Sequence, residues 1–477
     1  MNTVKKIAKN SIYLFGADVI NKISLLLIAI FIARFLGDAE FGRYSFAIAF
    51  SFFFFILGNF GLNNLIIRDV SKKRDEVKKY VDNVLSLRLI FSVISFFLLI
   101  IIINLMNYPS SVKLIVYLFG LYSILDTVSE MFKAVFYAFE EIKYIAITRI
   151  INKSLILIFS LLALFFGYGL LYVAYIFVIS ILIDILLSFL IVQKKFTKVS
   201  FGRDTAFWKF LLRKAWPFLL LNFFTIIYFK IDIVMLSKIS GDSVVGWYNA
   251  AYQLIEGIMM IPIIFMSVVF PVMSRLSAQS KESLIISCQK SLKYLIIIAL
   301  PIAVGTFLLS GRFIYWFYGP EFVNAGSSLN IIVLSIIFIF AVRPLSYSLI
   351  VIEKQRLNLF FVIIASIINI ILNLILIPKY AGNGAAISTL ICEIILFALI
   401  YCFFIKYFRK INILRIFFKP FIAAIAMGIF TFFFFKLNLV LLVGFSAIVY
   451  TLFILIFKTF KKDDVSLFRE LIKNDQP

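Results

Sequence analysis

The chain has 477 residues, of which 63% are hydrophobic, 18% aromatic and 15% charged. A soluble domain carries about a quarter charged and about half apolar residues, so this composition excludes a soluble globule and predicts a membrane protein. A backbone in hydrocarbon must satisfy its own hydrogen bonds, which leaves helices or a closed barrel. Barrel strands alternate apolar and polar residues, whereas the apolar runs here are unbroken, as in Phe96–Ile103 and Ile394–Ile405. The predicted fold class is therefore all-α and polytopic.

The formal net charge is +23, histidine is absent, and there are three cysteines, Cys288, Cys392 and Cys402. No two cysteines have the spacing of metal ligands, and the absence of histidine removes the commonest general base and metal ligand. We expect no metal and no cofactor. The positive charge is expected to contact anionic lipid of the inner leaflet, and a nucleic acid partner is not needed to explain it.

The first predicted span follows Lys5, Lys6 and Lys9, and no cleavage site of small residues follows a short apolar core, so we interpret it as a span and not as a removed signal. A span needs about 20 apolar residues. In chain order this criterion predicts about fourteen spans, at 11–36, 41–65, 84–106, 112–138, 145–166, 170–192, 215–237, 246–272, 291–311, 326–350, 357–377, 384–405, 416–435 and 438–457.

Lysine and arginine are concentrated in segments that fall on one side of these spans, at 68–79, 194–214, 406–419 and from Lys458. The positive-inside rule makes that side cytoplasmic and places both termini there. Residues 203–214 mix Phe207, Trp208 and Phe210 with basic residues, which predicts a helix lying on the cytoplasmic surface. The expected location is the plasma membrane.

Two segments of the chain are similar to each other. LGDAEFGRYSFA begins at Leu36 and SGDSVVGWYNAA begins at Ser240, with matched positions at one constant offset. The two copies are six spans apart and point the same way, as in a parallel repeat; the alternative is that both are merely a favoured tight turn. The repeat predicts an N-terminal six-helix lobe at 1–192, an interfacial linker at 193–214, a C-terminal six-helix lobe at 215–410, two extra helices at 411–457 and a cytoplasmic tail at 458–477.

Several charged residues fall inside predicted spans, where each costs several kcal/mol unless it faces a partner or water. Lys22, Lys230 and Arg343 suit a water-filled pathway that accepts an anion, with Arg88 behind them and Asp232 tempering their charge. The alternative is that they form structural ion pairs with acids such as Asp184, Glu256 and Glu393.

Three charges of one predicted span, Asp126, Glu130 and Lys133, share a helix face by their spacing and could simply neutralise one another. Arg88, Lys133 and Lys153 lie near cytoplasmic span ends, where a long side chain can snorkel to water. The acids that could bind a coupling cation are Asp126, Glu130, Asp184, Glu256 and Glu393.

The order of several short motifs resembles the polysaccharide flippases, of the O-antigen type, in the multidrug/oligosaccharidyl-lipid/polysaccharide exporter superfamily. The motifs are Ala33–Gly37 through Tyr44, Asn59–Leu62 before Arg68-Asp69, Lys230–Asp232 with Gly246–Ala251, Pro271–Leu276, Tyr318–Phe322, and Asn369 through Asn373 to Pro378 followed by Gly384–Ala386.

This resemblance implies two six-helix bundles, a central cationic cavity, alternating access and no ATP hydrolysis. It implies a polyprenyl-diphosphate-linked oligosaccharide as substrate, with the glycan polymerase or glycosyltransferases of the same pathway as partners. The two extra helices match the fourteen-span members, including lipid II flippases, so the sugar stays open.

Two other functions compete with this interpretation. A membrane enzyme acting on the same lipids needs a sizeable outer loop with acids, arginine or histidine, and the longest predicted outer loop offers only Arg312 and Glu321. A cation-coupled multidrug antiporter would share the fold and would rely on membrane acids such as Asp184 or the Asp126 and Glu130 pair. The sequence favours a transporter over an enzyme.

Overall fold

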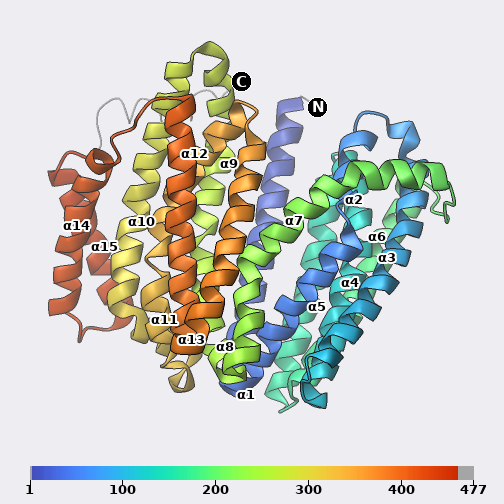
Figure 1. Ribbon diagram of the computed structural model, residues 1–477, viewed down its shortest axis with the longest axis horizontal. Helices are drawn as coiled ribbons and strands as arrows, with labels where there is room; N and C mark the ends of the chain where they lie inside the picture. The colour runs from blue at the N-terminus through green and yellow to red at the C-terminus, as the bar shows by residue number, and fades with distance from the viewer. Residues whose placement is uncertain (1–2, 460–477) are drawn as a thin grey trace. The chain divides into compact units, whose positions relative to one another are not determined.

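The computed structural model describes residues 3–459, with side chains at residue 16 and from residue 19 onward, so the predicted tail lies outside the described residues beyond Thr459. Across 3–459 the chain forms helices and no strand, which confirms the all-α fold class (Figure 1). The helices are α1 (Thr3–Asn59), α2 (Leu62–Leu65), η1 (Ile66–Val70), η2 (Arg74–Glu76), α3 (Val77–Leu105), α4 (Ser110–Ala138), α5 (Ile142–Phe165), α6 (Leu170–Lys195), α7 (Thr205–Ser240), α8 (Asp242–Ile258), α9 (Met260–Gln279), α10 (Lys281–Tyr318), η3 (Pro320–Phe322), α11 (Ala325–Ile332), α12 (Ser335–Val351), α13 (Gln355–Tyr407), α14 (Ile413–Phe433) and α15 (Leu439–Ile456).

Twelve spans of the described chain are long and apolar enough to cross a membrane, fewer than the fourteen or so predicted. The difference arises because α1 and α13, of 57 and 53 residues, each contain one non-helical residue, Gly37 and Ala381. A crossing needs about 20 residues, so each break divides its helix into two pieces that can both cross. The loops predicted at these two places are therefore reduced to turns around a single residue.

The chain divides into two compact units, Met1–Asn249 and Ala250–Pro477. In the first unit α1 packs against α4 and α5, and α4 also packs against α3 and α6. One apolar core cluster of this unit includes Phe132 and Phe136 of α4 and Leu211 of α7, all buried. In the second unit α10 contacts α9, α12 and α14, and α12 packs on α13. The boundary between the units falls within α8.

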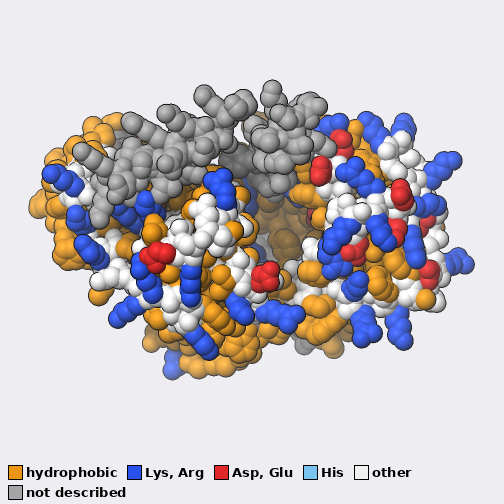
Figure 2. Space-filling view, turned by 90° about the horizontal axis from the view of Figure 1, so that it is seen from above, with side chains coloured by type: hydrophobic (Ala, Val, Ile, Leu, Met, Phe, Trp, Pro, Cys, Tyr) orange, Lys and Arg blue, Asp and Glu red, His pale blue; other side chains and the backbone are white. Residues whose placement is uncertain are grey.

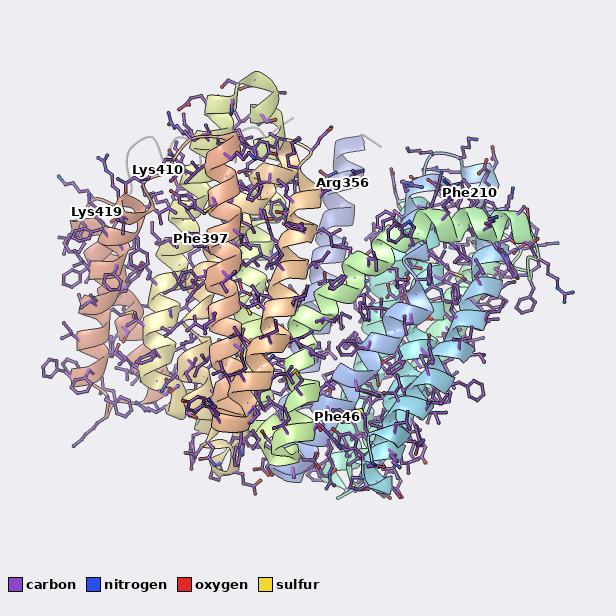
Figure 3. All side chains as sticks on the ribbon, in the orientation of Figure 1. Phe46, Phe210, Arg356, Phe397, Lys410 and Lys419 are labelled. Carbon is purple, nitrogen blue, oxygen red and sulfur yellow. The ribbon has the colours of Figure 1, made fainter. Side chains whose placement is uncertain are left out.

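Helix α7 begins in the segment that the sequence predicted as a surface helix and continues without interruption into a span. Its first part runs across the neighbouring helices of the first unit, and Phe210 lies on this part (Figures 1 and 3). Pro217 lies inside the helix, where it removes one backbone hydrogen bond and allows a bend. Asp204 caps the start by accepting a hydrogen bond from the Phe207 amide at 2.9 Å.

The two similar segments form the same kind of turn. Gly37 has φ 82° and ψ −180°, and Gly241 has φ 87° and ψ 173°. Both values lie in the left-handed region, which glycine adopts without the steric cost of a Cβ atom. The sequence match therefore extends to the backbone conformation of the turn.

The two turns also pack against each other in a reciprocal way. A Cβ atom on Gly42 would overlap the carbonyl oxygen of Asp242, and a Cβ atom on Gly246 would overlap that of Asp38. In the sequence match Gly42 corresponds to Gly246 and Asp38 to Asp242, so each contact is the counterpart of the other. Such a self-complementary pairing is typical of an interface around a two-fold axis.

Side chains reinforce this contact. Arg43 Nε donates to Asp242 Oδ2 at 2.8 Å, and Ser243 donates to Asp38 Oδ1 at 3.2 Å. Asn249 Nδ2 donates to Ser45 Oγ at 2.7 Å, and these two residues occupy matched positions. A bond between a position and its own counterpart lies where a two-fold axis would pass.

Candidate functional site

A polar cavity lies within the first unit, between α1, α4, α5 and α6, with a volume of about 340 Å³. On the α1 side its wall is apolar apart from Asn21, and on the α4 and α5 sides it is charged. The lining residues are Asn21, Leu25, Ile48, Phe52, Phe55, Tyr122, Ser123, Asp126, Glu130, Lys133, Arg149, Asn152, Lys153 and Phe177.

Lys133 is the centre of a buried ionic cluster at one side of the cavity. Its Nζ lies 2.9 Å from Asp184 Oδ2 on α6 and 3.3 Å from Glu130 Oε1 on α4. Asp184 also accepts a hydrogen bond from Ser129 at 2.5 Å, and it is 2% exposed. Because one ammonium group meets two carboxylates, the charges are paired where desolvation would otherwise penalise each of them. Snorkelling is wrong for Lys133, since its side chain turns toward buried acids.

Helix α5 completes the charged wall. Arg149 lies 3.8 Å from Glu130 Oε1, and Lys153 donates to the Tyr122 hydroxyl at 3.1 Å. Asp126 lines the same cavity, and neither it nor Lys153 belongs to an ion pair among the described residues. Three cations, Lys133, Arg149 and Lys153, thus face three acids, Asp126, Glu130 and Asp184. Asp184 lies behind Lys133 and not in the lining, so the cavity wall itself carries three cations and two acids, and one of these acids and one amine can meet a ligand.

Arg88 does not line this cavity. Its guanidinium is fully buried and donates to the Thr127 carbonyl at 2.6 Å and to Asn63 Oδ1 at 2.7 Å. Both acceptors are neutral, and the Nε atom has no hydrogen-bond partner among the described residues. Snorkelling is wrong here too, because the group ends inside the protein. Arg88 ties α3 to α2 and α4 within the first unit.

The other predicted pathway residues of the first unit lie apart from the cavity wall. Lys22 is exposed on α1, next to the lining residue Asn21. Lys230 is half-buried on α7. Asp232, two residues on, is 2% exposed and accepts a short hydrogen bond from the Tyr248 hydroxyl. Its other oxygen accepts a hydrogen bond from the Ile233 amide at 2.8 Å. Asp232 is therefore held by neutral donors of α7 and α8.

The remaining predicted residues belong to the second unit. Arg343 is half-buried on α12, directly before Pro344, and Glu393 is buried on α13 at 5% exposure. Glu256 is half-buried near the end of α8. These three residues come from three different helices.

Sequence reasoning missed Arg149 and Tyr122 as members of the charged cavity. Arg149 precedes Lys153 by four residues on α5, a spacing that places both on one helix face, so a signal was present. Tyr122 precedes Asp126 by the same spacing on α4. Its hydroxyl has no charge, and a tyrosine in a span is usually an apolar packing residue, so the sequence carried little sign of its role.

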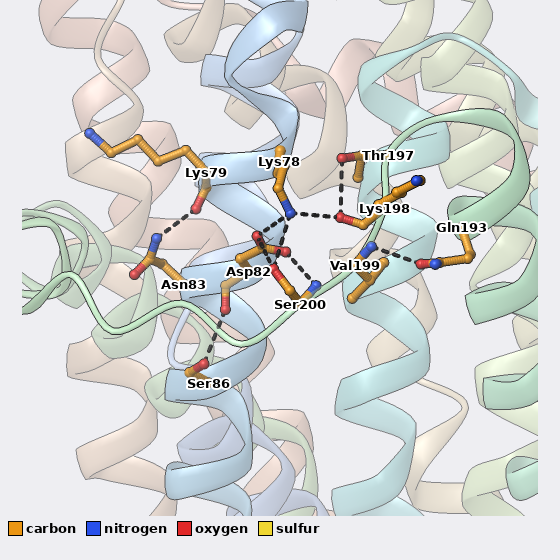
Figure 4. A network of polar contacts seen from close by, with 10 residues as sticks. All are labelled: Lys78, Lys79, Asp82, Asn83, Ser86, Gln193, Thr197, Lys198, Val199 and Ser200. Atoms are coloured by element: carbon orange, nitrogen blue, oxygen red, sulfur yellow. Dashed lines mark hydrogen bonds and ion pairs between the residues drawn. The ribbon is translucent and has the colours of Figure 1, made fainter.

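The connection between α6 and α7 is fastened to the start of α3 by a separate polar network (Figure 4). Asp82 accepts hydrogen bonds from the Ser200 amide at 2.8 Å and hydroxyl at 2.6 Å, and its other contact is Lys78 Nζ at 2.8 Å. Asn83 Oδ1 accepts from Trp208 Nε1 at 2.9 Å. The network holds the first part of α7 in place on this side of the unit.

Basic side chains are widespread on the face seen from above in Figure 2. One local pair beside the α3 network is Arg68 and Asp69, with Nε and Oδ1 2.7 Å apart. The hydrogen bond from Arg68 lowers the pKa of the Asp69 carboxyl, and a second one from Tyr80 at 3.0 Å acts in the same direction. Asp69 therefore stays ionised, and its negative charge partly offsets the positive charge of the basic residues around it.

Comparison with known proteins places this architecture among membrane transporters. The sequence model of the family described as "Polysaccharide biosynthesis protein" matches residues 7–277, and that described as "MatE" matches residues 217–375. The chain is 26% identical over 400 residues, 80% of its length and 94% of the relative's, to a Shigella flexneri protein described as "Putative O-antigen transporter".

Two solved structures share the fold. A lipid II flippase in an inward closed conformation superposes with a TM-score of 0.78 at 20% identity, covering 94% of this chain and 99% of the other. An inward-facing multidrug transporter of the MOP superfamily superposes with a TM-score of 0.65 at 15% identity, covering 81% and 94% of the two chains.

Proposed function

Because the chain belongs to the polysaccharide biosynthesis protein family, whose model matches more than half of it, we propose that it flips a polyprenyl-diphosphate-linked oligosaccharide from the cytoplasmic to the outer leaflet. The chain is a multi-pass membrane transporter of the flippase superfamily, and its relatives are transporters and not enzymes. The observation that carries the proposal is the match to this family together with the O-antigen transporter relative along 80% of the chain.

The chemistry of such a substrate defines what the protein must provide. A diphosphate cannot cross hydrocarbon bare, because desolvating even one of its charges costs many kcal/mol before pairing. The headgroup must meet fixed cations in a wet pathway while the polyprenyl tail stays in lipid. These fixed cations must bind the headgroup with only moderate affinity, because the substrate must also leave.

We assign the pathway cations to Lys22, Lys230 and Arg343. Lys22 is exposed, and Lys230 and Arg343 are half-buried, so none of the three is fully enclosed in the protein interior. Asp232, two residues from Lys230, tempers its charge. Arg88 is the fourth cation of the assignment. It is fully buried and is held by neutral hydrogen-bond acceptors, so it contributes a fixed positive charge farther from the substrate.

The parallel repeat accounts for how the protein would open to one side of the membrane at a time. Two six-helix lobes at 1–192 and 215–410 alternate in access, joined by the linker at 193–214 and followed by the helices at 411–457. The shared turn at Gly37 and Gly241 and the reciprocal contacts of Gly42 and Gly246 support this organisation. The protein lies in the plasma membrane with both termini cytoplasmic, near the polymerase or glycosyltransferases of a surface polysaccharide pathway.

A second candidate function is a cation-coupled multidrug antiporter. The charged cavity of the first unit favours it, because Asp126 faces that cavity with no ion pair to any described residue and could bind a proton or metal cation. Glu130 and Asp184 are the other coupling acids there, and Glu256 and Glu393 are those of the second unit. Transport of lipid II is a third candidate, supported by the flippase fold match.

Export of glycan by cells tests the proposal. Lys230→Ala and Arg343→Ala should each abolish export of the surface glycan, while the protein remains inserted. Lys230→Arg and Arg343→Lys should retain part of it, because a mobile diphosphate needs charge more than shape. Lys436→Ala, at an exposed lysine between α14 and α15, is the matched control and should export normally.

Normal export by the Lys22/Lys230/Arg343 triple alanine variant would contradict the cationic pathway. Drug efflux lost in Asp126→Asn would then favour the antiporter. Accumulation of lipid II in cells lacking the protein, with intact surface glycan, would favour the third candidate.

A further inference from the structure

The charged cavity of the first unit also contains polar atoms that have no partner among the described residues. Asn152 of α5 is 3% exposed, and its Nδ2 atom has no hydrogen-bond acceptor there. The Oδ1 atom of Asn21, on α1, is buried and has no donor. Both residues line the cavity, so an open donor and an open acceptor border the same space. Burial without a hydrogen bond is costly for each of them, so both favour a polar ligand.

Two open charges belong to the same wall. Asp126 of α4 forms no hydrogen bond or ion pair with a described residue. Lys153 of α5 donates to the Tyr122 hydroxyl at 3.1 Å and has no further hydrogen bond in the described part of the chain. Both side chains are half-buried. A carboxylate accepts several hydrogen bonds and an ammonium group donates three, so each can still bind a ligand.

A cation alone does not account for this set of groups. It would pair with Asp126, but Lys153 of the same wall would repel it, and the amide donor of Asn152 would stay unpaired. The volume of about 340 Å³ lies within the range of small-molecule sites, about 300–1,000 Å³. An organic ligand that both donates and accepts hydrogen bonds therefore fits the cavity better.

A pyranose ring is complementary to the cavity. Each hydroxyl group of a sugar can donate and accept, so neighbouring hydroxyl groups can bind an amide, a carboxylate or an ammonium group. The C–H faces of the ring are apolar, and the α1 wall offers Leu25, Phe52 and Phe55 to them. An uncharged sugar also leaves the charges of Asp126 and Lys153 to balance each other.

The cavity lies close to one of the proposed pathway cations. Asn21 directly precedes Lys22 on α1, and the Lys22 side chain is exposed. Neighbouring Cα atoms are about 3.8 Å apart. When a diphosphate meets Lys22, the sugar attached to that diphosphate is the part of the substrate nearest to the cavity.

We propose that this cavity binds the sugar next to the diphosphate of the transported lipid, as an uncharged pyranose ring. Asp126 accepts hydrogen bonds from its hydroxyl groups, and the Asn152 amide donates one. The inference rests on the proposed function, because it names the part of the transported headgroup that the cavity recognises.

Saturation-transfer NMR of the purified full-length protein with the methyl glycosides of glucose, galactose and N-acetylglucosamine tests the proposal. Lipid nanodiscs hold the protein, because alkyl-glycoside detergents would compete. At least one glycoside should receive saturation from the wild type. Asp126→Asn should weaken its binding about tenfold, because a charged acceptor forms the stronger hydrogen bond. Asn152→Leu keeps the volume and loses the donor, and should weaken binding about fivefold.

Two control variants lie in the same unit outside the cavity. Asp75→Asn changes an exposed acid of η2, and Asn104→Leu changes an exposed asparagine of α3. Both should bind the glycoside as the wild type does.

Several results would overturn the proposal. They are saturation of none of the three glycosides by the wild type, or equal affinity of Asp126→Asn and Asp75→Asn. Tighter binding of glucuronate than of methyl glucoside would make the cavity an anion site. Sodium binding that is lost in Asp126→Asn, with sugar binding unchanged, would make it a cation site. Glycan export identifies which proposal has failed. Export lost in cells lacking the protein, with no sugar bound, overturns this inference alone, whereas normal export in such cells overturns the proposed function.

Discussion

Lys133 shows how a single buried charge can organise part of a membrane protein. It joins α4 to α6 through Asp184 and lies on the same helix face as Glu130. A buried ion pair adds little stability compared with an apolar replacement of both partners, but loss of one partner leaves a buried charge without compensation. The cluster should therefore respond very differently to single and to paired substitution.

Lys133→Met should destabilise the protein by about 3–5 kcal/mol, because Asp184 would keep its charge in a buried site. The double variant Lys133→Met/Asp184→Asn should recover part of that loss. Lys153→Met is the matched control, since Lys153 bonds only to the neutral Tyr122 hydroxyl among its described hydrogen bonds and should cost less. Thermal unfolding in detergent, monitored by fluorescence-detected size-exclusion chromatography, gives the melting temperatures of the three variants. Equal melting temperatures for Lys133→Met and Lys153→Met would show that the cluster is not a stabilising unit.

At this scale the sequence could predict neighbours on one helix but not partners across helices. The spacing of Asp126, Glu130 and Lys133 predicted a shared face, and all three line one cavity. The pairing of Lys133 with Asp184 depends on the register between α4 and α6, which no local pattern carries. Arg88 illustrates the same point, because its acceptors are a backbone carbonyl and an asparagine on other elements.

At the scale of elements, the lengths of the apolar runs predicted most of the helices. The predicted spans at 170–192 and 112–138 correspond closely to α6 and α4. The breaks within α1 and α13 were also predicted, because polar residues interrupt the apolar pattern at 37–40 and 378–383, and the non-helical residues Gly37 and Ala381 lie in these two gaps. The prediction treated residues 203–214 as a separate helix, although α7 is continuous and bends at a proline.

Gly42→Ala should disrupt the contact between the two turns. The added methyl group would overlap the Asp242 carbonyl, which belongs to rigid backbone, so α8 must move, at a cost of about 1–3 kcal/mol as in overpacked cores. Gly246→Ala should behave alike, because its methyl group would meet the Asp38 carbonyl.

Gly257→Ala is the control for this experiment. It lies in α8 as well, and nothing approaches within 4 Å of the added atom, so its melting temperature should match or exceed that of the wild type. Unchanged stability in both Gly42→Ala and Gly246→Ala would mean that the two turns are not closely packed in the membrane.

For the whole molecule, the distribution of basic residues predicts the direction of insertion. In a Cys402→Ser background, which removes the exposed cysteine and keeps the two buried ones, Ser110→Cys and Lys436→Cys should react with an impermeant thiol reagent on intact cells. Ser71→Cys and Arg356→Cys are also exposed positions and should react only after the cells are opened. Reaction of Ser71→Cys from outside would invert the proposed orientation.

The pairing of the two turns has a consequence for the origin of the chain. A half-length ancestor carrying one such turn could have associated with a second copy of itself through the same glycine and aspartate contacts. Gene duplication and fusion would then have placed both partners in one polypeptide and released them from the need to stay identical. Under this proposal Arg43 and its counterpart Trp247 are positions that diverged, because among the described residues only Arg43 of this matched pair supplies a cation to the aspartate opposite it. An interface between two identical chains would thereby have become a contact within one chain, and each half could then acquire its own charged residues.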